Sequence, residues 1–92
     1  MSTLQGASEQ KGRNPDLLWR VVGGEALLLD TSSGDYFSLD PIATEIWTRL
    51  NDGETPESIS SSIAQRYAVD EAVVHRDVTD LISELHTAKL WD

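Results

Sequence analysis

The stretch from Leu27 to Pro41 constrains the fold more than any other part of this chain, because it predicts a strand, a tight turn, a second strand and a capped helix in direct succession. Thr31 to Asp35 are turn formers, and Tyr36 to Leu39 are strand formers. Asp40 suits a helix N-cap, and Pro41 suits the first helical position, where its missing N–H leaves no bond unmade. A helix is therefore expected to begin directly after the strand.

The segment Tyr36 to Leu39 is predicted to be an edge strand, and it carries neither proline nor lysine. Those residues commonly protect a sheet edge from pairing with other chains. An unprotected edge exposes unpaired N–H and C=O groups, on which an extended peptide can add as a further strand. This strand is therefore either a liability for aggregation or a peptide-binding site.

The composition excludes several classes of protein before any motif is considered. At 92 residues the chain suits one domain with one modest core. It contains no cysteine, which excludes disulfides, thiolate catalysis, iron–sulfur clusters and zinc sites with cysteine ligands. Its formal net charge of -9 disfavours nucleic acid and anionic membranes as partners.

The sequence predicts neither a membrane-spanning segment nor a targeting segment. Its longest apolar run, Ala26 to Leu29, has four residues, whereas a helix that crosses a bilayer needs roughly 20. Met1 to Asp16 is polar, shows no periodicity and lacks the apolar stretch of a signal peptide. We therefore expect a cytoplasmic protein, with a disordered tail over residues 1–16 and a folded domain over residues 17–92.

Three strands and three helices are expected within the domain. Gly23 and Gly24 offer the positive φ angles of a two-residue hairpin turn between strands at 18–22 and 25–30. The strand at 25–30 then lies between two edge strands, 18–22 and 36–39. The three helices are expected to begin after the caps Asp40, Thr55 and Asp70. Each helix has apolar residues at helical spacing: Ile42, Ala43, Ile46, Trp47 and Leu50 in the first, Ile59, Ile63 and Tyr67 in the second, and Val74, Val78, Leu81, Ile82 and Leu85 in the third.

This order of elements predicts an α+β domain of the winged helix-turn-helix type, with a three-stranded antiparallel sheet before the three helices. Domains of this type often read DNA with one helix in the major groove. DNA binding requires clusters of Lys and Arg, and the third helix is acidic. Its polar faces and its end carry Asp70, Glu71, Asp77, Asp80 and Glu84 against Arg76 and Lys89. The charge therefore argues against a DNA-binding function.

Most of the chain, from Leu18 to Leu90, resembles a PqqD-like domain. No single segment is specific, but the ordered set is. The matching segments are Leu27-Leu28-Leu29-Asp30, Gly34-Asp35-Tyr36-Phe37-Ser38-Leu39-Asp40, Ala43-Thr44-Glu45-Ile46-Trp47, Thr55-Pro56-Glu57-Ser58-Ile59 and the helix from Asp77-Val78 to Leu90.

The resemblance implies a recognition element for the leader segment of a ribosomally made precursor peptide. The leader would add as a strand to residues 36–39 and pack against the third helix. A free-standing copy of this size resembles the leader-binding protein of lasso peptide pathways, which delivers the precursor to a separate leader peptidase and to a cyclase. Quinone-cofactor biosynthesis uses a similar free-standing domain, so both pathways stay open at this point.

The candidate peptide-binding residues lie on the third strand and the third helix. Val73 is an apolar residue beside the core stripe, and it either lines a groove or is simply half exposed. Asp77 and Asp80 either pair with basic leader residues or form a solvated acidic face. The complete set is Tyr36, Phe37, Ser38, Leu39, Val73, Arg76, Asp77, Asp80 and Leu81.

Four aromatic positions have alternative interpretations. Tyr36 and Phe37 point to opposite faces of their strand, so one of them faces the core, and the sequence does not say which. Trp19 belongs either to the core or to a docking patch for a downstream enzyme. Trp91 either closes the bottom of the core or frays.

No residue pattern predicts catalysis, a metal or a cofactor. His75 and His86 are eleven residues apart on one helix, which places them about 16 Å apart along its axis at about 1.5 Å per residue. The serines lack a nucleophile elbow, and the chain has no glycine-rich phosphate loop. We therefore expect a non-catalytic adaptor that binds a peptide. The alternative is a winged-helix regulatory or protein-interaction domain with a folded protein as its partner.

Overall fold

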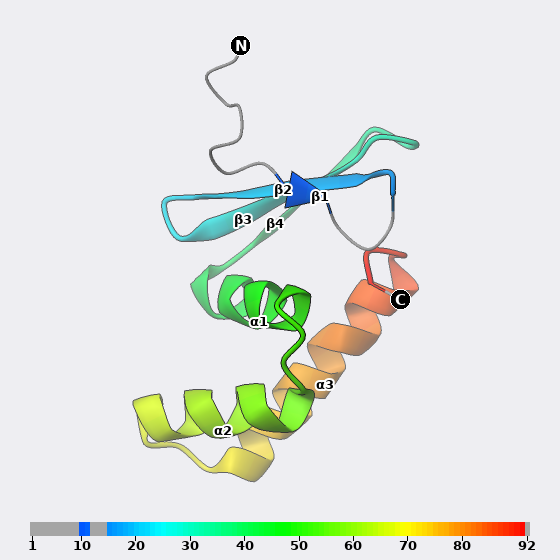
Figure 1. Ribbon diagram of the computed structural model, residues 1–92. Helices are drawn as coiled ribbons and strands as arrows, with labels where there is room; N and C mark the ends of the chain where they lie inside the picture. Colours follow the sequence, from blue (N-terminus) through cyan, green and yellow to red (C-terminus); the bar gives the residue numbers. More distant parts are fainter. Residues whose placement is uncertain (1–9, 12–14, 92) are drawn as a thin grey trace.

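A four-stranded antiparallel sheet lies over three helices in the computed structural model, which describes residues 10–11 and 15–91 (Figure 1). The strands follow one another in the order β1-β2-β3-β4 across the sheet. The elements are β1 Gln10–Lys11, β2 Leu17–Val22, β3 Glu25–Asp30, β4 Asp35–Leu39, α1 Pro41–Asn51, α2 Pro56–Tyr67 and α3 Glu71–Thr87. The predicted α+β class, with three antiparallel strands followed by three helices, is confirmed.

Two glycine-containing turns set the register of the sheet. Gly23 and Gly24 have φ angles of 61° and 82°, a region that costs glycine little, and they pair Val22 with Glu25. In the second turn the carboxylate of Asp30 accepts hydrogen bonds from the hydroxyl and the N–H of Ser32, at 2.7 Å and 2.9 Å. These bonds, the hydroxyl first, lower the pKa of Asp30 below its usual range.

The strand β1 lies within residues 1–16, the segment that the sequence predicts to be a disordered tail. Gln10 and Lys11 pair with Trp19 and Leu18 of β2, so a short piece of this segment adds to the sheet. Residues 1–9 and 12–14 of the predicted tail lie outside the described residues. The strand β1 therefore lies beside β2 at one edge of the sheet, whereas β4 forms the other edge.

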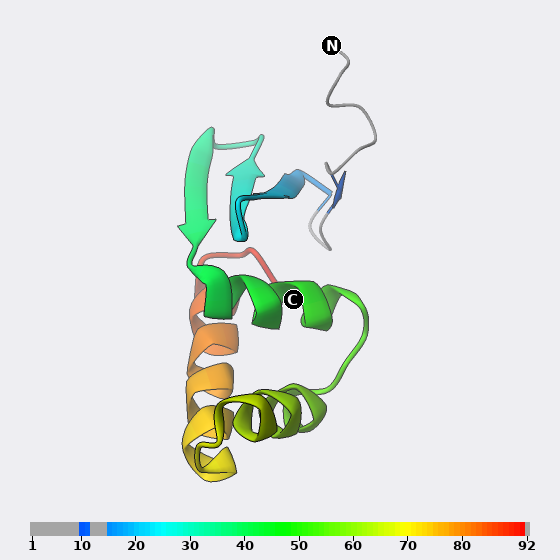
Figure 2. The same ribbon diagram turned by 90° about the vertical axis from the view of Figure 1, so that its left-hand side faces the viewer.

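The three helices are arranged below one face of the sheet (Figure 2). The helix α1 lies next to the sheet and α2 lies below α1, while α3 rises along one side from the level of α2 to a point just below the sheet. As predicted, the side chains of Asp40, Thr55 and Asp70 accept hydrogen bonds from N–H groups in the first turns of α1, α2 and α3. No helix within the described part of the chain has the length and apolar character needed to cross a membrane.

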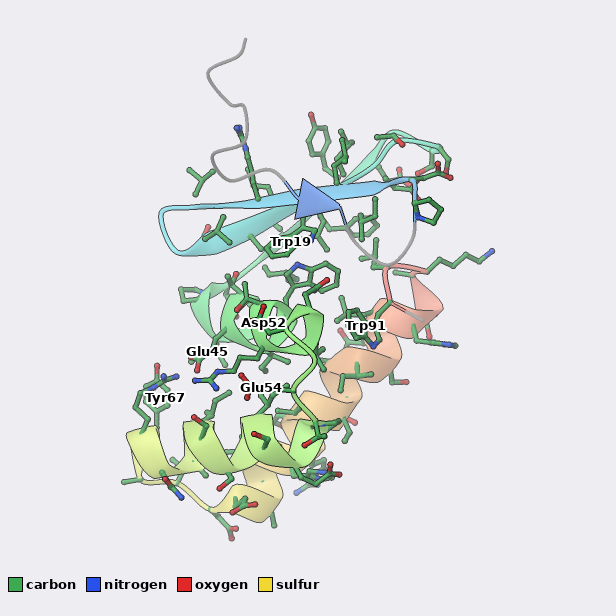
Figure 3. All side chains as sticks on the ribbon, viewed as in Figure 1. Trp19, Glu45, Asp52, Glu54, Tyr67 and Trp91 are labelled. Atoms are coloured by element: carbon green, nitrogen blue, oxygen red, sulfur yellow. The ribbon has the colours of Figure 1, made fainter. Side chains whose placement is uncertain are left out.

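Tryptophan side chains occupy the centre of the core. Trp47 of α1 is fully buried and makes edge-to-face contacts with Trp19 and Trp91, at ring-centroid distances of 5.7 Å and 5.9 Å (Figure 3). Trp19 is only 5% exposed, so it belongs to the core and not to a docking patch. Trp91 packs against the core from the C-terminal side.

Two positions of the predicted apolar stripes are not in the core. Tyr67, at the end of α2, is 52% exposed, and its ring lies under the guanidinium group of Arg66 at 5.1 Å. Ile42 lies at the margin of the stripe of α1, in its first turn, and is 40% exposed. The remaining members of the stripes are buried or partly buried.

The hydroxyl of Thr44 joins α1 to two strands of the sheet. Its oxygen accepts a hydrogen bond from the N–H of Ala26 at 2.8 Å, and it donates to the C=O of Leu39 at 3.0 Å. Ala26 and Leu39 are register partners, so this buried hydroxyl stands between them at the end of the β3–β4 ladder. The sheet and the start of α1 are thereby held together.

We expect Thr44→Val to lower the free energy of unfolding by about 1 to 3 kcal/mol, because valine keeps the shape of threonine and leaves the buried N–H of Ala26 without an acceptor. Urea denaturation measures this loss. The matched control is Thr48→Val, since the Thr48 hydroxyl donates only to the Glu45 C=O in the same helix, at 3.0 Å. Equal losses in the two variants would contradict a structural role for the Thr44 bridge.

Candidate functional site

Main-chain groups of β4 form the open edge of the sheet. The N–H of Ala26 donates to Thr44 and not to β2, so it points toward the β4 side of β3. Because alternate residues of a strand point their N–H and C=O groups the same way, Leu28 also faces β4 and is paired there with Phe37. Tyr36 and Ser38 therefore direct their N–H and C=O groups outward, away from the sheet.

The two faces of β4 differ sharply in exposure. Phe37 faces the helices and packs against the core, whereas Tyr36 is 75% exposed on the opposite face. This answers the question that the sequence left open. A strand added beside β4 would place alternate side chains on the side of Phe37 and on the side of Tyr36.

A pocket of about 290 Å³ lies between β4 and the second half of α3. Figure 2 shows these two elements on the same side of the molecule, while α1 runs away from them toward the opposite side. Most of the pocket lining is apolar, and Glu84 is the one ionisable residue that lines the pocket. The lining residues are Phe37, Ser38, Leu39, Leu81, Glu84, Leu85, Ala88 and Leu90.

The segment after α3 closes the pocket. Lys89 adopts a positive φ of 62°, which turns the chain back, and the N–H of Leu90 then donates to the C=O of Leu85 at 2.8 Å. Leu90 is thereby buried under the sheet with 2% exposure. Ala88 is small and exposed, so it leaves the pocket open.

Four of the predicted peptide-binding residues meet at this pocket, and five do not line it. Those that meet are Phe37, Ser38, Leu39 and Leu81. Tyr36 lies on the same strand but faces the other way, and the other four, on α3, are exposed: Val73, Arg76, Asp77 and Asp80.

Val73 is too far along α3 to line the pocket together with Leu39 and Leu81. It precedes Leu81 by eight residues, which is about 12 Å along the helix axis. Val73 nevertheless lies on the same side of the helix as Glu84, since the two are eleven residues, close to three turns, apart. A contact between Val73 and a bound peptide therefore stays a prediction.

Reasoning from the sequence missed Glu84, Ala88 and Leu90 as lining residues and assigned Leu85 to the core alone. The positions 81, 84 and 88 recur at spacings of three and four, so a helical wheel centred on Leu81 would have found Glu84 and Ala88. Leu90 lies beyond the end of α3, and no periodicity points to it.

Ionic groups outside the pocket join the helices to one another. Glu45 accepts from Arg49 at 3.0 Å and also from Arg66, and Figure 3 shows it between α1 and α2. His75 of α3 lies 3.4 Å from Glu57 of α2. The pKa of Glu57 is lowered, first by a hydrogen bond from its own backbone N–H and then by His75.

The described residues contain no group of three or more His, Cys, Asp or Glu side chains arranged to hold a metal ion. The features that distinguish this region are instead an open strand edge and an apolar pocket next to it. Both are suited to binding an extended peptide.

Comparison with known proteins agrees with this geometry. The structure is similar to "TbiB1 in Complex with the TbiA(beta) Leader Peptide", with a TM-score of 0.78 and 32% sequence identity over 88% of this chain and 93% of that one. It is also similar to "Lasso peptide synthetase B1 complexed with the leader peptide", with a TM-score of 0.77 and 28% identity over 82% of this chain and 88% of that one. No curated protein matches the chain. A family model described as coenzyme PQQ synthesis protein D matches residues 25–90, from β3 to the residue that closes the pocket, and the chain therefore belongs to the PqqD family.

Proposed function

We propose that this protein binds the leader segment of a ribosomally synthesised precursor peptide. The observation that carries the proposal is the open edge of β4 lying directly beside the apolar pocket between β4 and α3. Two structurally similar proteins are described in complex with leader peptides, and this supports the same ligand class here.

The leader adds to β4 as a strand. Its main chain bonds to the outward N–H and C=O groups of Tyr36 and Ser38, which provides affinity that depends little on the leader's sequence. Side chains on the inner face of the added strand enter the pocket lined by Phe37, Leu39 and Leu81, and this provides selectivity. Binding therefore has a main-chain part and a side-chain part that separate variants can test.

The pocket can be tested with Ala88→Phe. A phenyl ring at this exposed position fills the space meant for a leader side chain, so we expect about a tenfold or greater loss of affinity, which corresponds to losing the burial of one apolar side chain. Fluorescence polarisation with a labelled synthetic leader measures it. The control Ala72→Phe places the same ring at the exposed start of α3, outside the pocket lining, and should bind like the parent. Identical affinities for both variants would place the peptide elsewhere.

In this proposal the protein is an adaptor and performs no chemistry itself. Holding the precursor raises its effective concentration at a separate leader peptidase and at a cyclase that bind the loaded adaptor. These two partners are assigned from the resemblance to the leader-binding protein of lasso peptide pathways, whereas the two similar structures are described with leader peptides.

We expect the isolated protein to leave a precursor peptide unchanged in mass and to accelerate its cleavage when the partner peptidase is added, because the bound substrate is presented at high local concentration. Mass spectrometry follows both reactions. Peptidase with precursor alone provides the reference rate. Covalent change of the peptide by this protein alone would refute the adaptor role.

A second pathway is favoured by one observation, the description of the matching family as a coenzyme PQQ synthesis protein. In that case the bound peptide is the precursor of a quinone cofactor. Parallel titrations with a lasso-type leader and with the precursor of the quinone cofactor distinguish the two, since each pathway predicts the tighter binding of its own peptide.

A further inference from the structure

Three carboxylates lie along the side of α3 on which Glu84 lines the pocket. Asp77, Asp80 and Glu84 recur at spacings of three and four, which places them along one side of the helix. Residues 15–91 offer none of these carboxylates a hydrogen bond or an ion pair. By contrast, Glu45 and Glu54 are both bound by Arg49 between α1 and α2.

Glu84 differs from Asp77 and Asp80 because it alone lines the pocket. Glu84 is exposed, and an apolar side chain that enters the pocket beside it would displace part of the water around its carboxylate. A carboxylate that loses water and gains no hydrogen bond opposes binding. A cationic group on the incoming peptide removes this penalty by making a charge-assisted hydrogen bond.

We infer that Glu84 selects a peptide with a lysine or arginine next to the apolar residue that fills the pocket. This inference rests on the proposed function and adds the chemistry of the ligand to it. Asp77 and Asp80 lie outside the pocket lining and stay in water, where an ion pair contributes little to affinity, so they attract the peptide without selecting its sequence. The net charge of -9 adds a long-range attraction for the same basic segment.

The test requires no knowledge of the natural leader. A displayed library of random twelve-residue peptides is selected on four proteins: the parent, Glu84→Lys, Asp52→Lys and Ser38→Pro. Asp52→Lys is the matched control, because it makes the same change in net charge at the exposed end of α1, away from β4 (Figure 2). Ser38→Pro removes an outward N–H of β4 and reports whether selection depends on the strand edge.

We expect the parent and Asp52→Lys to enrich peptides with lysine or arginine at one fixed position beside an apolar residue, and Glu84→Lys to enrich aspartate or glutamate there instead. For one selected peptide, Glu84→Gln should weaken affinity about tenfold, the lower range for a hydrogen bond to a charged group. The inference is overturned if the parent and Glu84→Lys enrich the same residues, or if Asp52→Lys reverses the preference as Glu84→Lys does. If Ser38→Pro selects the same peptides as the parent, the proposed strand addition itself is wrong.

Discussion

Ser38→Pro is expected to abolish leader binding while leaving the fold intact. Ser38 is paired with Leu27 at a position where its own N–H and C=O point away from β3, so proline breaks no bond within the sheet. It does remove a donor from the free edge, and its ring occupies the place of the incoming strand. Together these two effects weaken the binding free energy by about 3 kcal/mol, which is about a hundredfold loss of affinity.

Fluorescence polarisation with a labelled synthetic leader measures the loss, and circular dichroism checks the fold. Ser38→Ala is the matched control, since it changes the side chain and keeps the N–H; its affinity should stay close to that of the parent. A Ser38→Pro variant that is folded and still binds as the parent does would show that the peptide does not pair with β4. An equal loss of affinity in Ser38→Ala would show that the peptide is recognised by the Ser38 hydroxyl and not by the main chain.

Trp47→Ala is expected to have the largest effect on stability. The side chain is fully buried and touches both other tryptophans of the core, Trp19 and Trp91. Its removal leaves a cavity that a small core cannot close, and this lowers the free energy of unfolding by about 3 to 5 kcal/mol. The free energy of unfolding of a natural domain is only about 5 to 15 kcal/mol, so this variant loses much of its stability.

The urea midpoint, followed by far-ultraviolet circular dichroism, measures this loss. The control is Trp91→Ala, which removes a partly buried indole at the margin of the same cluster and should cost clearly less. A Trp47→Ala protein with the midpoint of the parent would show that the core is not organised around this residue.

Much of the fold follows from local patterns. The caps Asp40, Thr55 and Asp70 could be identified because short polar side chains bond to N–H groups only a few residues away. The turn at Gly23 and Gly24 could be identified because positive φ angles favour glycine. Residues 10–11 could not be predicted as a strand, since two polar residues carry no periodicity and their pairing with β2 depends on a contact distant in sequence.

Some features of the candidate site could likewise be predicted from the sequence, and others could not. The open edge at residues 36–39 could be predicted because strand order and the lack of proline and lysine are both visible in the sequence. The outward direction of the Ser38 main chain could not, because it depends on the pairing of β3 with β4. Tyr67 falls at the apolar spacing of α2, and the structure leaves it exposed beside Arg66.

The sequence by itself determined the approximate positions of β2, β3, β4 and the three helices, which strand lies open at the edge and what net charge a partner meets, because these depend on neighbouring residues or on composition. Only the tertiary structure decided that Phe37 faces inward, that Thr44 closes the strand ladder and that Glu84 and Leu90 line the pocket with β4. Those relations join residues far apart in the chain, and they exist only once the core has been packed.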